Sequence, residues 1–543
     1  MPDKKTEDCQ GEWKSDFIKH YRGSERENPI MARKLMLQGT MSNVGKTLLT
    51  AGLCRILRQD GYVVMPFKAQ NMSLNSCITA DGSEIARAQV LQAEAAGAEP
   101  TADMNPLLLK PTGLTGSQVI LQGHVLENMT AADFYRRKAE FLPKILESFR
   151  RLEKQADILL IEGAGSPVEL NLRKDDLVNM GFAEQVDAPV LLIGDIDPGG
   201  VFAQLLGTLE LLTEEERARV KGLIVNKFRG DRALFEDGVR ILEERSGLPV
   251  VGVVPYMDLA LSDEDSMSER LRGRSRLSGS NAKGQETYGF ETQSEGSAVF
   301  DIAVIRYPRI SNFTDFDVFD AWPDMSIRYV THPAELGNPD LLILPGSKNT
   351  MADLTWMRET GMDRAVLAYA KHGPVFGICG GYQMLGETID DPWNVEQGGI
   401  IEGLRLLETD TVLETDKTQG RREGVIDDSL YGALRCLRGC RVSGYEIHMG
   451  RTVLVISSDV AKSLQGTVLY EEHSIYGTYL HGFFDAPEVI PALRRSLAIR
   501  RGIRLPDTEA VDYTAFKEQE YDRLAEVLRS SLDMKKIYEI LDV

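Results

Sequence analysis

The chain has 543 residues, too many for a single hydrophobic core, so its length predicts about two or three domains. Hydrophobic residues make up 43% of the chain and charged residues 27%, as in an ordinary soluble globular protein. The formal net charge of −20 argues against a general nucleic-acid or membrane-binding surface, so we expect no nucleic-acid and no membrane partner.

The sequence also lacks the signals of export. No apolar run approaches the roughly 20 residues needed to span a bilayer, and the N-terminal stretch MPDKKTEDCQGEWKSD has no signal-peptide core. Six cysteines lie far apart, which predicts a reducing cytoplasmic location rather than a disulfide framework. Cys436 and Cys440 have no second pair of zinc ligands, so we expect them to be structural.

Residues 1–30 are polar and patternless, which predicts a loosely ordered extension. Over residues 31–261, short apolar runs alternate with longer amphipathic stretches. The runs are KLMLQG (34–39), YVVMPFK (62–68), DILLIEG (157–163), PVLLIGD (189–195), GLIVNKF (222–228) and PVVGVVP (249–255). Apolar strands separated by helices predict an α/β domain with a doubly wound parallel sheet.

Residues 262–298 are rich in Ser, Gly and charge, which predicts an interdomain linker. A second doubly wound α/β domain is expected over residues 299–505. Its apolar runs are FDIAVIRYP (300–308), DLLILPGS (340–347), PVFGIC (374–379), GTVLYEE (466–472) and SIYGTYLHG (474–482). The tail, 506–543, has helical periodicity, and we expect it to pack on one of the domains.

The first chemical motif is GTMSNVGKT (39–47), which lies between an apolar strand and a helical pattern. In such a loop, backbone N–H groups and a helix N-terminus bind phosphate. The lysine would neutralise the β/γ-phosphates, and the threonine hydroxyl would bind Mg²⁺. The expected ATP-binding residues here are Gly39, Thr40, Asn43, Gly45, Lys46 and Thr47. The loop is one residue longer than the usual pattern, so a glycine turn followed by an exposed lysine is the alternative.

Two later strands end in polar residues that could support this loop. Glu162, in LLIEGAGSP, stands where a second Mg²⁺ ligand would lie at the carboxyl edge of the sheet. Asn226, in LIVNKFRGD, could contact a nucleobase edge as part of the ATP site. A solvated strand end and a turn-forming asparagine are the respective alternatives.

The first domain resembles the dethiobiotin-synthetase-like P-loop family, which carries G-T-x-x-x-x-G-K-[ST] and E-G-A-G and uses ATP to activate a carboxylate. PFKAQNMSLNS (66–76) and DGSEIARAQVLQA (81–93) are similar to the cobyric acid synthase family in particular. That resemblance implies that the substrate-facing residues are Lys68, Gln70 and Asn71. It also implies that Glu84, or with less support Asp81, joins Thr47 and Glu162 around Mg²⁺. An ordinary helix start with polar caps is the alternative.

The second motif is FGICGGYQMLG (376–386), the cysteine version of a nucleophile elbow. Glycines on both sides of Cys379 permit a sharp turn, and the following helix N-terminus favours a thiolate. The N–H of Gly380 could donate to an oxyanion, with a second donor from around Gly346 and Ser347 in LPGSKN. On these residues alone, Cys379 could equally fill a tight turn.

A thiol nucleophile needs a base, and His481 in GTYLHGFFD competes for this role with His448 in GYEIHMG. Residues 300–485 resemble triad-type glutamine amidotransferases, with PGSKNT, GICGGYQMLG and YLHG in the family's order. The resemblance implies that Cys379 is the nucleophile and His481 the base. Most members have a glutamate two residues after the histidine, where this chain has Phe483. The candidates to orient His481 are Glu446 and Asp485.

A carboxylate-activating domain and an ammonia-releasing domain in one chain predict an ATP-dependent amidation. Their order over about residues 31–505 resembles the cobyric acid synthase family. The resemblance implies amidation of the b, d, e and g carboxylates of adenosylcobyrinic acid a,c-diamide. ATP, glutamine and a corrinoid would be the small-molecule ligands and Mg²⁺ the metal cofactor, and a homo-oligomer is compatible with the sequence.

Two other functions are considered. The sister enzyme cobyrinic acid a,c-diamide synthase has the same two domains, but KAQNMSLNS (68–76) favours the cobyric acid synthase family. A P-loop regulatory ATPase with an inactive amidotransferase-like domain usually carries an early additional lysine in the loop. Residues 40–44 contain none, and the Cys379–His481 pair is intact.

Overall fold

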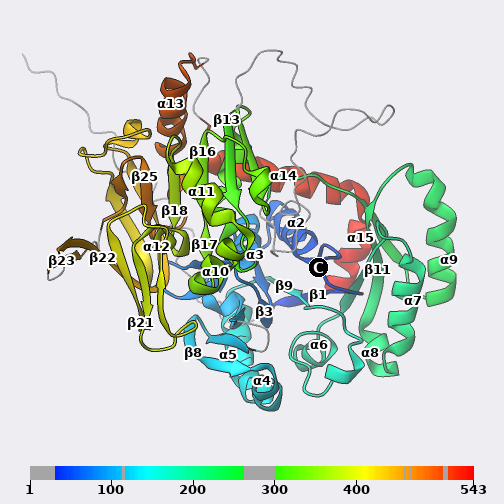
Figure 1. The fold of residues 1–543 in the computed structure, drawn as a ribbon. Helices are drawn as coiled ribbons and strands as arrows, with labels where there is room; N and C mark the ends of the chain where they lie inside the picture. The colour runs from blue at the N-terminus through cyan, green and yellow to red at the C-terminus, as the bar shows by residue number, and fades with distance from the viewer. Residues whose placement is uncertain (1–30, 113–115, 262–299, 458–459, 464–466, 506–510) are drawn as a thin grey trace, which may run out of the picture.

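The computed structural model describes residues 31–112, 116–261, 300–457, 460–463, 467–505 and 511–543. The expected extension (1–30) and linker (262–298) lie outside the described residues. Two α/β units are visible, each built on a six-stranded sheet, so the predicted fold class is confirmed (Figure 1). No helix of the described part is long and apolar enough to cross a bilayer.

The first sheet is parallel and has the order β12-β11-β10-β1-β9-β2. Its strands are β1 (Arg33–Gly39), β2 (Val64–Phe67), β9 (Ile158–Glu162), β10 (Val190–Asp195), β11 (Val220–Phe228) and β12 (Val250–Pro255). Each corresponds to one predicted apolar run, because helices cover both faces of the sheet and bury the strands. The carboxyl ends of β1, β9 and β11 therefore meet at one edge.

The helices of this domain are α2 (Lys46–Gln59), α3 (Arg87–Ala96), α4 (Ala131–Arg137), α5 (Leu142–Glu153), α6 (Met180–Val186), α7 (Val201–Leu211), α8 (Glu214–Arg219) and α9 (Glu236–Ser246). Two small sheets, absent from the sequence predictions, lie in the insertion between β2 and β9. Their strands are β3 (Gln70–Met72), β4 (Ser76–Ile78), β5 (Glu84–Ala86), β6 (Leu107–Pro111), β7 (Gly116–Leu121) and β8 (His124–Thr130). Several of these strands have only three residues, too few to show a periodicity.

The second sheet has the order β15-β13-β16-β18-β25-β24 and is parallel except for the edge strand β24. Its strands are β13 (Phe300–Ile305), β15 (Met325–Val330), β16 (Leu341–Leu344), β18 (Val375–Ile378), β24 (Tyr470–Glu472) and β25 (Ile475–Thr478). Its helices are α10 (Thr350–Thr360), α11 (Met362–Ala370), α12 (Gly380–Leu385) and α13 (Val489–Arg501). The edge strand β15 was missed because most of its residues are only partly buried.

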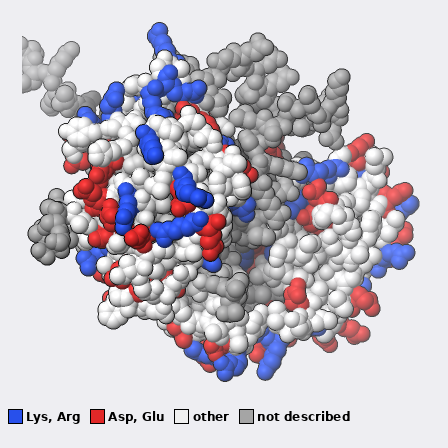
Figure 2. All heavy atoms as spheres, in the orientation of Figure 1, with Lys and Arg blue, Asp and Glu red and all other residues white. Residues whose placement is uncertain are grey.

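A five-stranded, mostly antiparallel sheet stands beside the second domain. Its strands are β19 (Thr388–Asp391), β20 (Gly399–Glu402), β21 (Thr409–Val425), β22 (Arg441–Ser457) and β23 (Val460–Ser463). A two-stranded pair, β14 (Ile310–Ser311) with β17 (Gly346–Ser347), lies next to the carboxyl edge of the second sheet. Figure 2 shows acidic and basic side chains interspersed on one face of the molecule.

The C-terminal helix α14 (Tyr513–Ser531) contacts both domains, and α15 (Met534–Leu541) packs on the first (Figure 1). Asp512 caps α14 by accepting hydrogen bonds from the next backbone N–H groups. Leu524 and Leu528 lie in the core of the first domain, whereas Tyr513 and Phe516 pack against the core of the second. The helix expected in the tail is therefore present and contacts both domains.

We expect Leu528→Ala to lower the stability of the protein measurably. Leu528 is fully buried against Gly52 of α2, where a β-carbon would collide with it. Removing its side chain leaves a cavity, and such a change costs about 2–5 kcal/mol. Thermal unfolding measures the effect, with Leu234→Ala as the control because Leu234 is 85% exposed. Equal melting temperatures for the two variants would contradict the packing described here.

Candidate active sites

The loop after β1 has the backbone of a phosphate-binding loop. Gly45 has φ of +96° and Asn43 has φ of +60°, the left-handed region that a tight loop at a helix start requires. The amide of the buried Asn226 donates to the carbonyl of Val44 (2.7 Å), and Lys227 Nζ donates to the carbonyl of Asn43 (2.6 Å). Both contacts come from the end of β11 and hold the loop in shape.

Asn226 thus braces the loop, a role that the sequence did not predict. Its side chain also excludes a β-carbon at Gly45, which explains the glycine there. The Oδ1 atom of Asn226 is buried and has no hydrogen-bond partner among the described residues, so an acceptor remains for a ligand. Its contact with a nucleobase stays a prediction. Thr40 Oγ1 donates to Gln204 Oε1 of α7 (3.1 Å).

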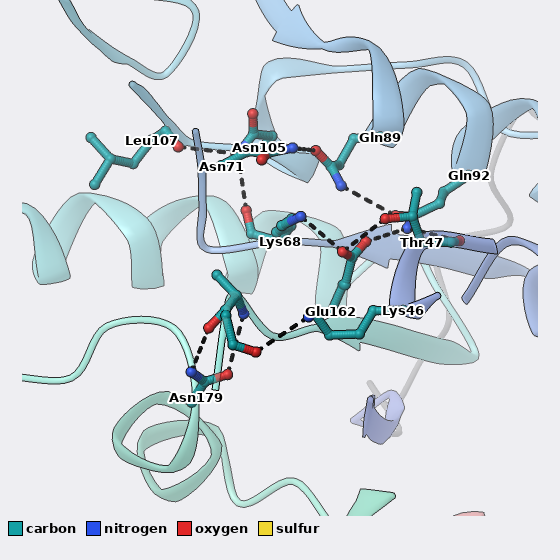
Figure 3. A network of polar contacts seen from close by, with 12 residues as sticks. Lys46, Thr47, Lys68, Asn71, Gln89, Gln92, Asn105, Leu107, Glu162 and Asn179 are labelled. Carbon is teal, nitrogen blue, oxygen red and sulfur yellow. Dashed lines mark hydrogen bonds and ion pairs between the residues drawn. The ribbon is translucent and has the colours of Figure 1, made fainter. Parts of the chain in front are cut away.

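Lys46, the first residue of α2, joins two loops at the edge of the sheet. Its Nζ donates to the carbonyl oxygens of Met41 (3.2 Å) and of Gly165 (3.3 Å). Gly165 lies in the loop after β9, which Asn179 holds by donating to the carbonyl of Ala164 (2.6 Å). The ammonium group therefore lies between the two loops, where phosphate is expected (Figure 3).

Glu162, the last residue of β9, is the centre of a buried polar network (Figure 3). Its Oε1 accepts from Thr47 Oγ1 (3.0 Å) and from Lys68 Nζ (2.8 Å), and its Oε2 accepts from Gln92 Nε2 (2.5 Å). Thr47 and Glu162 are thus adjacent, as expected for two Mg²⁺ ligands. The described residues contain no group of three or more His, Cys, Asp or Glu side chains placed to hold a metal ion.

The predicted substrate segment is connected to this network. The amide of Asn71, on β3, donates to Gln89 Oε1 (2.9 Å), and Gln89 Nε2 is 3.5 Å from Gln92 Oε1. Gln70 lies on the same strand and is half-buried. Gln89 and Gln92 were missed by the sequence analysis. They lie three residues apart on one face of α3 and relay the contact from Asn71 to Glu162.

The structure places Glu84 in a different set of contacts from the one expected. Its Oε1 binds Lys110 Nζ (2.8 Å), and its Oε2 binds Lys417 Nζ of the second domain (2.5 Å). Burial opposes the charge, but the two lysines outweigh it and hold the pKa of Glu84 well below its usual range. Glu84 serves as a buried ion-pair partner across the domain boundary, and the geometry lends no support to its expected metal role. Asp81 accepts locally from Ser83 N (3.1 Å).

Cys379 lies in a strained turn between β18 and α12. Its φ and ψ are 52° and −110°, a conformation that costs a non-glycine residue about 1–3 kcal/mol. Its N–H donates to the carbonyl of Thr478 (2.8 Å). A β-carbon at Gly381 would collide with the carbonyl of Leu344, so the turn requires a glycine there. The predicted elbow is present, and the thiol Sγ is 3.8 Å from the carbonyl oxygen of Ile447.

The expected oxyanion donors lie around this elbow. A β-carbon at Gly380 would be 2.9 Å from the backbone nitrogen of Ser347, and one at Gly346 would be 3.3 Å from His481 Cε1. Strand β17, which holds Gly346 and Ser347, is itself held by β14. The predicted residues of the second site thus come together around Cys379.

His481 is oriented by Asp315, a residue that the sequence analysis did not single out. His481 Nδ1 is 2.7 Å from Asp315 Oδ2, and the N–H of Gly482 donates to Asp315 Oδ1 (3.0 Å). This bond fixes the ring orientation and leaves Nε2 available. Burial alone would lower the pKa of His481, but the Asp315 carboxylate and the nearby Cys379 outweigh it and raise the pKa to about 10.

The expectation that Glu446 or Asp485 orients His481 is wrong. Glu446 accepts from Arg422 Nε (3.1 Å) and lies 3.8 Å from His448 Nε2. Asp485 is half-buried, and the burial of its carboxyl group raises the pKa of that group to about 7. The carboxylate that replaces the usual glutamate comes instead from residues 313–321, far earlier in the chain.

Two further residues at this site have other roles. Phe483 stands where most family members have the glutamate, and its ring packs on Phe376 in the core with centroids 5.2 Å apart. The rival base His448 stacks on Tyr479, with centroids 3.8 Å apart, and its Nδ1 is 2.7 Å from the carbonyl oxygen of Gly450. The geometry therefore favours His481 over His448 as the partner of Cys379.

Comparison with known proteins gives a family for each of the two domains. Residues 35–268 match the model of a CobQ/CobB/MinD/ParA nucleotide binding domain, and residues 301–489 match that of a CobB/CobQ-like glutamine amidotransferase domain. The chain is 47% identical over 532 residues to a cobyric acid synthase of Lachnoclostridium phytofermentans, with 94% of this chain and 99% of the relative covered. A cobyric acid synthase of Ruminiclostridium cellulolyticum is 48% identical over 522 residues, with 94% and 98% covered.

Proposed function

The chain belongs to the cobyric acid synthase family, and from this premise we propose that it amidates the b, d, e and g carboxylates of adenosylcobyrinic acid a,c-diamide with ATP and glutamine. The observation that carries the proposal is the presence of two separate polar sites in one chain. One is the phosphate loop with Lys46, Thr47 and Glu162. The other is Cys379 with His481 and Asp315.

The first domain activates a carboxylate of the corrinoid. The phosphate loop binds ATP, and Lys46 lies where it can neutralise the transferred phosphate. The buried oxygens of Thr47 and Glu162 are adjacent and are of the type that Mg²⁺ prefers, so these two residues would hold it. Bound Mg²⁺ would supply charge neutralisation at the phosphates. A carboxylate oxygen of the corrinoid takes the γ-phosphoryl group of ATP, and ADP leaves. Ammonia then attacks the carbonyl carbon of this acyl phosphate, inorganic phosphate leaves, and loss of a proton gives the amide.

The second domain supplies the ammonia. The Cys379 sulfur attacks the side-chain amide carbon of glutamine, and N–H groups around Gly346 and Gly380 stabilise the oxyanion. His481 passes the thiol proton to the amide nitrogen of the tetrahedral adduct. The C–N bond then breaks, ammonia leaves, and the glutamyl group remains on Cys379 as a thioester. Water then hydrolyses the thioester to glutamate and free thiol. Asp315 keeps the imidazole oriented throughout.

The substrate contacts are proposed for the segment around β3. Lys68 and Asn71 are already engaged with Glu162 and Gln89, so corrinoid binding here would act directly on the network of the ATP site. Gln70, which is half-buried on the same strand, is the least buried of the three predicted substrate-facing residues.

The proposal is tested by incubating the protein with adenosylcobyrinic acid a,c-diamide, ATP, Mg²⁺ and glutamine, and by identifying the corrinoid products by mass spectrometry. We expect successive amidations that end at cobyric acid. Amidation of cobyrinic acid at its a and c carboxylates, with the a,c-diamide left unchanged, would reject the proposed substrate. ATP hydrolysis without any amidation would reject the reaction.

We expect Asp315→Asn to move the pH profile of glutamine hydrolysis. Burial lowers the pKa of His481, but the Asp315 carboxylate together with Cys379 raises it to about 10. If hydrolysis needs the imidazolium–thiolate pair, its rate declines at alkaline pH only as the pH approaches that value. Asparagine keeps a hydrogen-bonding oxygen but removes the charge, so the pKa falls and the alkaline limb moves to lower pH. An alkaline limb in the same place in both proteins would contradict this role of Asp315.

A further inference from the structure

A short segment of the second domain holds two parts of the Cys379 site at once. This coupling segment is residues 310–315. At its start, Ile310 and Ser311 pair in β14 with Ser347 and Gly346 of the oxyanion loop. At its end, Asp315 binds His481. A shift of the coupling segment would therefore move the oxyanion donors and the imidazole together.

The middle of the coupling segment is fastened to the first domain by two asparagines. The N–H of Ser76 donates to Asn312 Oδ1 (3.2 Å), and the N–H of Phe313 donates to Asn75 Oδ1 (3.2 Å). All four groups are buried, and Asn312 has φ of +52°, which turns the chain between β14 and Asp315. Each domain thus satisfies a backbone donor of the other, and separating them would leave both donors unpaired.

A second connection reaches the site from the same residues of the first domain. The hydroxyl of Tyr445 donates to the carbonyl of Ser76 (2.9 Å), and the Tyr445 ring stacks on His481 with centroids 5.3 Å apart. Tyr445 and Ile447 also pack against Ile78 of β4. Strand β4 of the first domain therefore packs against two residues that lie beside Cys379 and His481.

Through the residues that precede it, β4 also leads back to the ATP site. It follows directly on the proposed corrinoid-facing segment that contains Asn71. Asn71 is hydrogen-bonded through Gln89 and Gln92 to Glu162. The proposed ATP and corrinoid site is therefore connected to the groups that orient His481. Hydrogen bonds between side chains make the connection from Glu162 to Asn71, and a few residues of chain make it from Asn71 to β4.

We propose that Asn312 is a positioning residue for glutamine hydrolysis, through which residues 75–76 of the first domain set the oxyanion loop and Asp315. The inference rests on the proposed function and adds that the first domain controls the second. Occupation of the first domain by ATP and corrinoid favours the productive position of the coupling segment, so glutamate release is fastest when an acceptor for ammonia is present. Such coupling requires only that the ligands prefer one position of the segment.

The test compares Asn312→Gly with the wild type in three assays: glutamate release alone, glutamate release with ATP and corrinoid, and amidation with ammonium. Glycine tolerates the left-handed backbone, so this change removes the acceptor for Ser76 without straining the turn. We expect ATP and corrinoid to accelerate glutamate release in the wild type. In Asn312→Gly that acceleration falls by about fivefold or more, while ammonium-dependent amidation stays within about twofold.

Two further variants make the test specific. Asn394→Gly is the matched control, because Asn394 has φ of +57° in an exposed loop of the same domain. It should behave as the wild type. Tyr445→Phe removes only the hydroxyl bond to Ser76 and should reduce the acceleration by a smaller factor. If Asn312→Gly does not fold, Tyr445→Phe tests the proposal in its place.

Several results would overturn the inference. One is a wild type whose glutamate release is unaffected by ATP and corrinoid. Another is full acceleration in Asn312→Gly, or in Tyr445→Phe if the glycine variant does not fold. A third is an equal loss of glutamine-dependent and ammonium-dependent amidation. Failure of the proposed function is a different observation: the wild type would then form no amide from either nitrogen source.

Discussion

Cys379→Ala should abolish glutamine-dependent amidation and leave ammonium-dependent amidation near the wild-type rate. The thiol in the strained turn after β18 is the attacking atom, and no hydroxyl or amine replaces it in alanine. Loss of a nucleophile lowers the rate by about 10³-fold or more, since only transition-state contacts remain. The synthetase site does not use Cys379, so added ammonium should restore product.

The measurement is corrinoid amide formation with each nitrogen source at saturating ATP. Cys436→Ala serves as the control, because Cys436 is a partly buried cysteine of the same domain outside the site. It should retain both activities. Glutamine-dependent turnover that survives in Cys379→Ala would reject the assignment of the nucleophile.

Glu162→Gln should abolish amidation with either nitrogen source while glutamine hydrolysis continues at its basal rate. The substitution removes the charge that Thr47, Lys68 and Gln92 surround, and with it a proposed Mg²⁺ ligand. We expect amidation to fall by about a hundredfold or more, since both metal binding and the surrounding contacts are lost.

The partner Lys68 is buried, so Glu162→Gln also leaves an uncompensated charge. Thr47→Val provides the second variant, because it removes a proposed ligand without a change of charge. Thermal unfolding shows whether either variant is folded, and Glu210→Gln, at an exposed position of α7, is the matched control. Amidation by Glu162→Gln at the wild-type rate would exclude Glu162 from the ATP site.

The sequence predicts those parts of the molecule that are determined by residues close together in the chain. Buried parallel strands are continuous apolar runs, so all six strands of the first sheet were predicted. The phosphate loop and the cysteine elbow were predicted because each needs glycines at fixed offsets within a few residues. At Gly45 and Gly381 the structure gives the reason, since a side chain at either position would collide with a neighbour.

The parts that escaped prediction depend on long-range contacts. Asp315 lies 166 residues before His481, within a short helix whose apolar residues pack in the core. Glu446 and Asp485 are closer to His481 in the sequence, which made them the expected partners. Glu84 was expected at the metal because of its place in a motif, but its partner Lys417 lies 333 residues away in the other domain. Neither the Asp315–His481 pair nor the Glu84–Lys417 pair produces a pattern in the local sequence.

The most direct test of the whole account follows the nitrogen atom. The wild type is given glutamine labelled with ¹⁵N in its side-chain amide, in a buffer that contains unlabelled ammonium, and the corrinoid product is analysed by mass spectrometry. The account predicts that ¹⁵N enters the new amides in the wild type, and that Cys379→Ala incorporates unlabelled nitrogen alone. Unlabelled amides formed by the wild type, with glutamine present and hydrolysed, would contradict the claim that the Cys379 site supplies the ATP site.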